Sequence, residues 1–200
     1  MLKHISHALL FGFMLLVLTA QVQAEQSPKQ TVQTAVDAIL DILTNETLDK
    51  EQKRAKMRET INERFDFRAM SQRTLATNWK KATKDEQKQF VDLFAQLIQN
   101  SYIGKVEAYT NEAVEYPAEK IKGKRAVVDT LIITSSTEIP VNYKLYLKNA
   151  EWHVYDVIIE GVSLISSYRS TYQEIVKKDG FQGLFAKMEK KLKELENQPS

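Results

Sequence analysis

Two titratable side chains lie inside an apolar segment, where burial could shift a pKa enough for catalysis by a general acid or base. Asp156 is followed by three consecutive apolar residues, and His153 precedes it by three positions. A carboxylate buried in a hollow can have a raised pKa and act as a general base. The simpler interpretation is that Asp156 bonds to the backbone or to an arginine such as Arg169 and holds the strand–helix corner. Glu160, directly before Gly161, is interpreted in the same way.

Residues that common catalytic and metal sites need are missing. Cysteine is absent and His153 is the only histidine beyond residue 7, so a site of cysteine and histidine ligands is excluded. A Ser–His–Asp triad would have to use His153, yet no G-x-S-x-G surrounds any serine. Neither a P-loop nor a G-x-G-x-x-G occurs, so no nucleotide is indicated. We therefore expect His153 on a strand surface, no metal and no other cofactor.

Basic residues gather in two places. Lys120, Lys122, Lys124 and Arg125 predict a basic turn. Such a turn is usually only a solvated loop, but it could also meet anionic headgroups or an acidic partner. The second cluster, residues 187–193, is interpreted as the polar face of the last helix. Over the whole chain, 28 basic and 26 acidic residues nearly balance, which gives no general attraction to nucleic acid.

The segment Trp152–Tyr172 must position Asp156, and its pattern indicates a strand, a turn and a helix. Trp152–Glu160 is rich in β-branched and aromatic residues, which favour a strand. Gly161 supplies the turn, and Ser163 can cap a helix by accepting hydrogen bonds from its first N–H groups. The rest of the chain is expected to pack around this unit.

Hydrophobic periodicity predicts the other elements. Four helices are expected from Pro28 to about Leu43, from the Asp49 cap to about Arg64, from the Asp66 cap towards Trp79, and from the Thr83 cap to about Tyr109. Four strands are expected at residues 111–116, ended by Pro117, and at 125–135, 139–147 and 152–160, followed by two helices that Gly180 separates. The fold class is therefore α+β, with a curved four-stranded antiparallel sheet packed with helices and a hydrophobic cavity between them.

The first residues carry an export signal. A weakly positive start precedes an apolar run, Ala8–Ala20, and a small-x-small site ends at Ala24. Residues 1–24 are therefore predicted to be a signal peptide cleaved after Ala24, and residues 25–200 to form one domain. An exported protein that lacks cysteine fits a bacterial periplasm, and its stability must come from its core.

Two blocks of residues resemble a known family. The first contains Phe65-Asp66-Phe67 and Trp79, and the second is W-x-V-x-D-V-x-x-E-G-V-S-L, from Trp152 to Leu164, followed by Tyr168-Arg169. They resemble the MlaC family of periplasmic phospholipid-binding proteins, also described as the toluene-tolerance family. The chain departs from the family pattern at Ala76, where the family often has glycine.

This resemblance implies a soluble periplasmic carrier that is not an enzyme. Members of the family resemble the nuclear-transport-factor-2-like (NTF2-like) architecture and hold phospholipid between helices and sheet. The implied partners are an MlaA-like outer-membrane lipoprotein–porin complex and an inner-membrane ABC transporter complex with an MlaD-like ring. Shuttling lipid between them would maintain the lipid asymmetry of the outer membrane. Phospholipid is then a cargo, not a cofactor, and we expect a monomer.

Binding of lipid tails would require a large apolar space inside the protein. Roughly thirty CH₂ groups at about 0.8 kcal/mol each amount to on the order of 24 kcal/mol of burial, so the tails should be almost wholly enclosed. The candidate lipid-binding residues are Phe94, Ile98, Tyr102, Ile133, Val141, Tyr143, Leu145, Trp152, Val154, Val162, Ile165 and Tyr168. Two other functions stay open at this point: a periplasmic chaperone that grips polypeptide, and an enzyme that uses Asp156 or His153 in the same hollow.

Overall fold

The computed structural model describes residues 26–108 and 113–197 of the 200-residue chain. The predicted signal peptide (residues 1–24), with its cleavage after Ala24, and the predicted strand start at residue 111 lie outside the described residues. Within the described ranges, no helix is both long and apolar enough to cross a membrane.

Helices occupy the first half of the described chain. They are α1 (Pro28–Thr44), α2 (Lys50–Arg64), α3 (Phe67–Leu75), the 3₁₀ helix η1 (Ala76–Lys80) and α4 (Lys84–Glu107). The predicted caps are confirmed: Asp49 and Thr83 form capping boxes with Gln52 and Glu86, and the Asp66 side chain accepts a hydrogen bond from Ala69 N. Each of these four α-helices therefore begins at a side chain that satisfies an N–H group left free by the helix, whereas η1 has no side-chain cap.

The second half forms one antiparallel sheet with strands in chain order. They are β1 (Ala113–Lys122), β2 (Arg125–Ile133), β3 (Glu138–Lys148), β4 (Glu151–Ile159) and β5 (Val162–Ser163). The α+β prediction is confirmed, with one strand more than expected. The additional strand β5 arises because Glu160 and Gly161, both with positive φ, make a two-residue hairpin turn before the helix begins.

The predicted end of the first strand at Pro117 is wrong. Pairing between β1 and β2 shifts register between Glu115 and Ala118, and then continues to Lys122. Proline cannot donate to the sheet, but it is tolerated on an edge strand at an irregularity of this kind. Because β1 is the edge strand, Pro117 interrupts the pairing without ending it.

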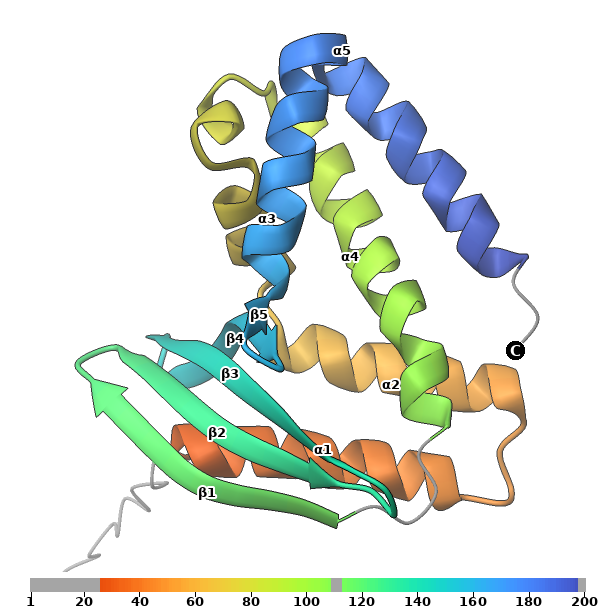
Figure 1. Ribbon diagram of the computed structural model, residues 1–200, viewed down its shortest axis with the longest axis vertical. Coiled ribbons are helices and arrows are strands. Elements are labelled where there is room, and N and C mark those ends of the chain that lie inside the picture. The colour runs from red at the N-terminus through yellow and green to blue at the C-terminus, as the bar shows by residue number, and fades with distance from the viewer. Residues whose placement is uncertain (1–25, 109–112, 198–200) are drawn as a thin grey trace, which may run out of the picture.

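The chain closes with α5 (Leu164–Glu196), which bends at Gly180. Gly180 has φ 66° and ψ −171°, a conformation that residues with a Cβ rarely adopt. The predicted division into two helices is confirmed at this residue. We call residues 164–179 the first arm and residues 181–196 the second arm; Figure 1 shows them as a V beside α4.

Buried apolar side chains form two cores. The helical core is built by α3, α4 and both arms of α5, and its members include Phe94, Ile165 and Phe185. The sheet core lies between α1 and one face of the sheet, and includes Val32 and Leu145. Figure 1 shows α1 lying along the sheet while α4 and α5 stand away from it. The half-buried side chains of Phe65 and Tyr102 pack against both cores.

Candidate functional site

Asp156 holds the corner between β4 and α5. Its carboxylate is buried and accepts hydrogen bonds from Ser163 Oγ at 2.8 and 3.0 Å and from Ile165 N at 3.3 Å. Lys144 Nζ approaches its Oδ2 at 3.4 Å. The structural interpretation of Asp156 is therefore confirmed for the backbone contact. The expected contact with Arg169 is wrong, because Arg169 Nε donates to the Arg73 carbonyl at 2.8 Å instead.

Ser163 joins this corner to the helix. Its hydroxyl donates to Asp156 and accepts a hydrogen bond from Ser166 N at 3.1 Å, as predicted for the cap. The negative carboxylate thus sits at the positive end of the α5 dipole. Neither of the two cavities described below is lined by Asp156.

A second acidic corner links α3 to β3. Asp66 accepts a hydrogen bond from the Tyr146 hydroxyl, and Lys148 Nζ lies 3.2 Å from its Oδ2. Burial raises the pKa of Asp66, but the hydrogen bonds from Tyr146 and Ala69 and the charge of Lys148 outweigh it and hold the pKa below its usual value. Burial and the same hydrogen bond raise the pKa of Tyr146 to about 12.

His153 lies on the other face of β4 from the buried Trp152 and Val154. Its ring is 6.2 Å from that of Tyr146, and its Nε2 is 3.7 Å from a carboxylate oxygen of Glu151. This is the strand-surface position that the sequence predicts for it. Among the described residues, no cluster of three or more histidine, aspartate or glutamate side chains is arranged to hold a metal ion.

The twelve predicted lipid-binding residues divide between the two cores. Phe94, Ile98, Ile165 and Tyr168 belong to the helical core, whereas Val141, Tyr143, Leu145, Trp152 and Val154 belong to the sheet core. Tyr102 packs against both. Ile133 ends β2 and is half-buried, and Val162 at the β4–β5 turn is 59% exposed. The structure therefore places ten of the twelve in or against the cores and two at the margin.

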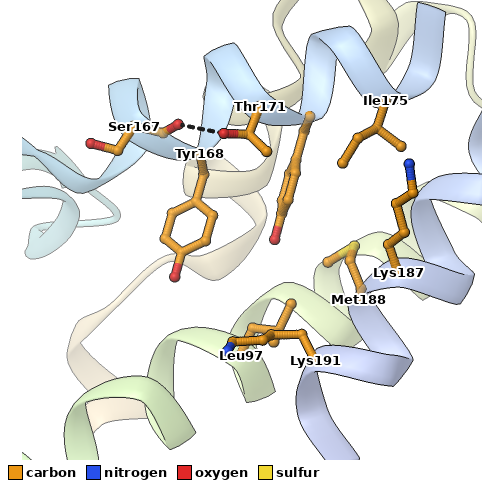
Figure 2. Close-up of a pocket in the computed structure, with 9 residues that line it drawn as sticks. Leu97, Ser167, Tyr168, Thr171, Ile175, Lys187, Met188 and Lys191 are labelled. Atoms are coloured by element: carbon orange, nitrogen blue, oxygen red, sulfur yellow. Dashed lines mark hydrogen bonds between the residues drawn. The ribbon is translucent and has the colours of Figure 1, made fainter. Parts of the chain in front are cut away.

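The first cavity, which we call the arm cavity, lies between α4 and the two arms of α5. Its volume is about 360 Å³. It is lined by Leu97, Ser167, Tyr168, Thr171, Tyr172, Ile175, Lys187, Met188 and Lys191. Figure 2 shows the side chain of Ile175 on the first arm facing Lys187 and Met188 on the second, and the ring of Tyr168 pointing towards Leu97 on α4. Apolar and aromatic groups therefore face one another across this cavity, with two lysines from the second arm.

The aromatic wall of this cavity is held by ring contacts with α4. Tyr168 and Tyr172 meet Phe94 edge to face, with ring centroids 5.4 and 6.3 Å apart. Burial raises the pKa of Tyr172, so its hydroxyl stays neutral. Lys187 is paired with Asp179 at 2.6 Å, and Lys191 lies 3.4 Å from Glu194. The interior of the cavity is apolar and its charges stay at the rim.

The second cavity, of about 500 Å³, lies between the α1–α2 connection and the end of α4. It is lined by Leu43, Leu48, Lys50, Lys53, Gly104, Glu107 and Ala108. Arg54 on α2 makes a two-pronged bond to Glu107, which lines the cavity, with N–O distances of 2.5 and 2.8 Å. Two further pairs join the same helices, Arg58 with Asn100 and Gln99 with Asn62. Polar side chains therefore hold α2 against α4 next to the cavity.

Comparison of the chain with known protein families finds one match. A family model described as MlaC protein matches residues 33–190. The chain belongs to the MlaC family. The resemblance predicted from the Trp152–Leu164 block is confirmed. The MlaC model spans α5 as far as residue 190, so it includes most of the arm cavity as well as the sheet.

Relatives of this MlaC family member include two curated bacterial proteins. The chain is 24% identical to an intermembrane phospholipid transport system binding protein MlaC from Haemophilus influenzae, over 83% of this chain and 82% of that protein. It is also 24% identical to the toluene tolerance protein ttg2D of Pseudomonas putida, over 78% and 76% of the two chains.

A solved structure shares the fold. It is a phospholipid-binding protein from Ralstonia solanacearum, determined in complex with a phospholipid. The TM-score is 0.80 and the identity 25%, and the match covers 86% of this chain and all of that one.

Most residues of the arm cavity were not predicted from the sequence. Tyr168 alone is shared with the predicted set. Tyr172 and Ile175 follow Tyr168 at helical spacing, which is the signal that could have found them. Lys187 and Met188 gave no such signal, because only the bend at Gly180 brings the second arm over the first.

Proposed function

We propose that this MlaC family member is a periplasmic phospholipid carrier that encloses acyl chains and moves lipid between membranes. The observation that carries the proposal is the phospholipid-bound relative, whose fold matches over its whole length. A carrier of this kind works through burial of apolar surface and needs no catalytic group. Export to the periplasm, a monomeric state and hand-over between MlaA-like and MlaD-like complexes belong to the same proposal.

The tails are proposed to lie where the helical core meets the sheet core, around Tyr102. Ten predicted lipid-binding residues lie on the two sides of this boundary. Several neighbouring apolar side chains are only half-buried, among them Val36 of α1, Ile139 of β3 and Ile159 of β4. Apolar surface that is left partly exposed gains most when a tail covers it.

Enclosing two tails requires the cores to separate slightly. Each described cavity falls in the lower half of the range of about 300–1,000 Å³ that small-molecule sites occupy. Few apolar residues join the two cores, and polar pairs such as Arg54–Glu107 hold the helices beside them. Opening the boundary exposes both partners of such a pair to water together, so neither charge is left buried and unpaired, and the boundary is able to open.

Mass spectrometry of the native protein tests the proposed function. We expect the purified protein to carry phospholipid, which organic solvent releases, and the mass to fall to that of the bare chain after extraction. Bound peptides, or a protein that stays empty after incubation with phospholipid vesicles, would contradict the carrier proposal.

A matched pair of tryptophan variants tests the location. Val36→Trp fills space beside the sheet, and Ile175→Trp fills the arm cavity. Both side chains are half-buried, so both variants should fold. We expect Val36→Trp to lower phospholipid occupancy severalfold and Ile175→Trp to leave it near the parent level. The reverse result would place the tails in the arm cavity while leaving the carrier function intact.

A further inference from the structure

The hairpin that joins β1 to β2 combines charge with an exposed apolar side chain. Its last paired residues are Lys122 and Arg125, and Gly123 and Lys124 make the two-residue turn. Figure 1 shows this turn at the end of the sheet, beyond the start of α1. Every residue from Lys120 to Arg125 is exposed. The hairpin tip, as we call these six residues, is therefore free of cover from the rest of the described chain.

The hairpin tip is strongly basic. Four of its six residues are lysine or arginine and none is acidic. Lys120 is 3.7 Å from Asp129 and stays 78% exposed, so this carboxylate offsets one charge without covering the lysine. The other three cations of the tip, Lys122, Lys124 and Arg125, form no ion pair with the described residues.

Ile121 supplies an apolar group among these cations. Two large apolar side chains are exposed in the described part of the chain, Ile121 at 55% and Val162 at 59%. Ile121 stands opposite the buried Ala126 and so shares the α1 side of the sheet. It lies on β1, an edge strand of the sheet, one residue before the turn-flanking Lys122. An isoleucine surrounded by lysines suits an interface in which apolar and anionic groups lie side by side.

We propose that the hairpin tip docks on the surface of an anionic phospholipid membrane, with Ile121 entering the headgroup region. Cations near such a surface contribute additively, and an apolar side chain adds burial at the acyl boundary. A stable protein interface needs about 20–30 residues on each side, which six residues do not provide. The tip lies at the end of the β1–β2 pair and includes none of the twelve predicted lipid-binding residues, so docking is separable from lipid cargo.

Sedimentation with lipid vesicles tests this docking on lipid-loaded protein. We expect binding to vesicles that contain phosphatidylglycerol, weak binding to pure phosphatidylcholine vesicles, and loss of binding when salt rises from about 0.05 to about 0.5 M. Removing one cation should weaken binding about fivefold, so the double reversal Lys122→Glu/Lys124→Glu should weaken it at least about 25-fold. These side chains are exposed, so the folded state should persist, which circular dichroism checks.

Two matched controls separate the tip from general charge and general hydrophobicity. Lys80→Glu/Lys81→Glu changes charge equally at another exposed site and should leave vesicle binding within about twofold. Ile121→Ser should weaken binding severalfold, whereas Val162→Ser, at the other exposed apolar side chain, should not.

Equal binding to anionic and zwitterionic vesicles would overturn the docking proposal. An unchanged vesicle affinity of Lys122→Glu/Lys124→Glu would also overturn it. If this variant bound vesicles normally but no longer bound a partner protein, the tip would be assigned to an acidic protein surface instead. Phospholipid occupancy, measured by mass spectrometry on Lys122→Glu/Lys124→Glu and Ile121→Ser, should stay at the parent level. A failure of docking is thereby distinguished from a failure of the carrier function.

Discussion

The helical core and the sheet core differ in their buried side chains, which include many aromatic rings in the helical core and are mostly aliphatic in the sheet core. Phe90, Phe94 and Leu184 of the helical core are 0% exposed, and aromatic rings pack there in stacked and edge-to-face contacts. In the sheet region, side chains such as Ile139 and Ile159 are only half-buried although they pack on the sheet core. Aromatic ring contacts therefore tie the helical core together, whereas the sheet region has half-buried aliphatic side chains at its margin.

This difference indicates which region of the protein can change shape when lipid binds. A densely packed interior resists deformation, because moving one side chain disturbs all its neighbours. A region with apolar groups at its margin loses less when it opens, and gains when a tail covers those groups. We infer that the helical core acts as the stable body and the sheet region as the part that adapts.

Truncation of the helical core should have the largest effect. Phe94→Ala is expected to lower the free energy of unfolding by about 3–5 kcal/mol, because it removes a buried ring and leaves a cavity. Ile139→Ala in the sheet region should lower it by only about 1–2 kcal/mol, since its side chain is already half-exposed. Urea unfolding of both variants measures the two values. Equal losses would remove the distinction between the regions.

The next largest effect is expected at Asp156, which joins the two regions. Asp156→Asn keeps the shape but loses the charge that Ser163, Ile165 N and Lys144 satisfy, so we expect about 1.5–3 kcal/mol of destabilisation. Chemical denaturation measures this loss. Phospholipid occupancy should be retained by the folded variant, because the residue serves the corner. Folded protein that has lost its lipid would assign Asp156 a direct role in binding.

Residues that cap helices and alternate along strands could be predicted from the sequence, because their roles depend on near neighbours. Ser163 and Asp66 were assigned correctly as caps, the period of two located β3, and the β-branched and aromatic residues located β4. Pro117 was misjudged because whether proline ends a strand depends on which strand lies beside it. That information is not local to the sequence.

The candidate site was harder to predict for the same reason. The contact of Asp156 with Lys144 depends on the register between β3 and β4, which no local pattern fixes. Likewise, Met188 lines the same cavity as Tyr168 only because α5 bends back at Gly180. Which side chains are apolar was visible in the sequence, but which of them face a common space was not.

A smaller, pH-dependent effect is expected at Asp66, the second joint between helices and sheet. Its folded-state pKa is below the usual value, so the stability it contributes is present above about pH 4 and is lost as the pH falls through the lowered pKa. Asp66→Asn should therefore cost about 1 kcal/mol at neutral pH and nothing in acid, where the parent is protonated. Unfolding curves from neutral to acid pH measure the difference. A gap between parent and variant that is constant with pH would contradict the charge-based role.

The smallest expected effect is a gain in stability from a substitution at the end of α3, in the helical core. Ala76, which ends α3, has φ 50° and ψ −119°, a conformation that suits glycine and strains any residue with a Cβ by about 1–3 kcal/mol. Ala76→Gly removes this strain, but glycine adds about 0.4–1 kcal/mol of chain entropy in the unfolded state. We expect a net gain of about 1 kcal/mol in thermal unfolding. Ala55→Gly, at an exposed position inside α2, should instead lose about 1 kcal/mol. If both variants lose stability, the backbone at Ala76 is not strained, and the well-packed region tolerates this conformation without cost.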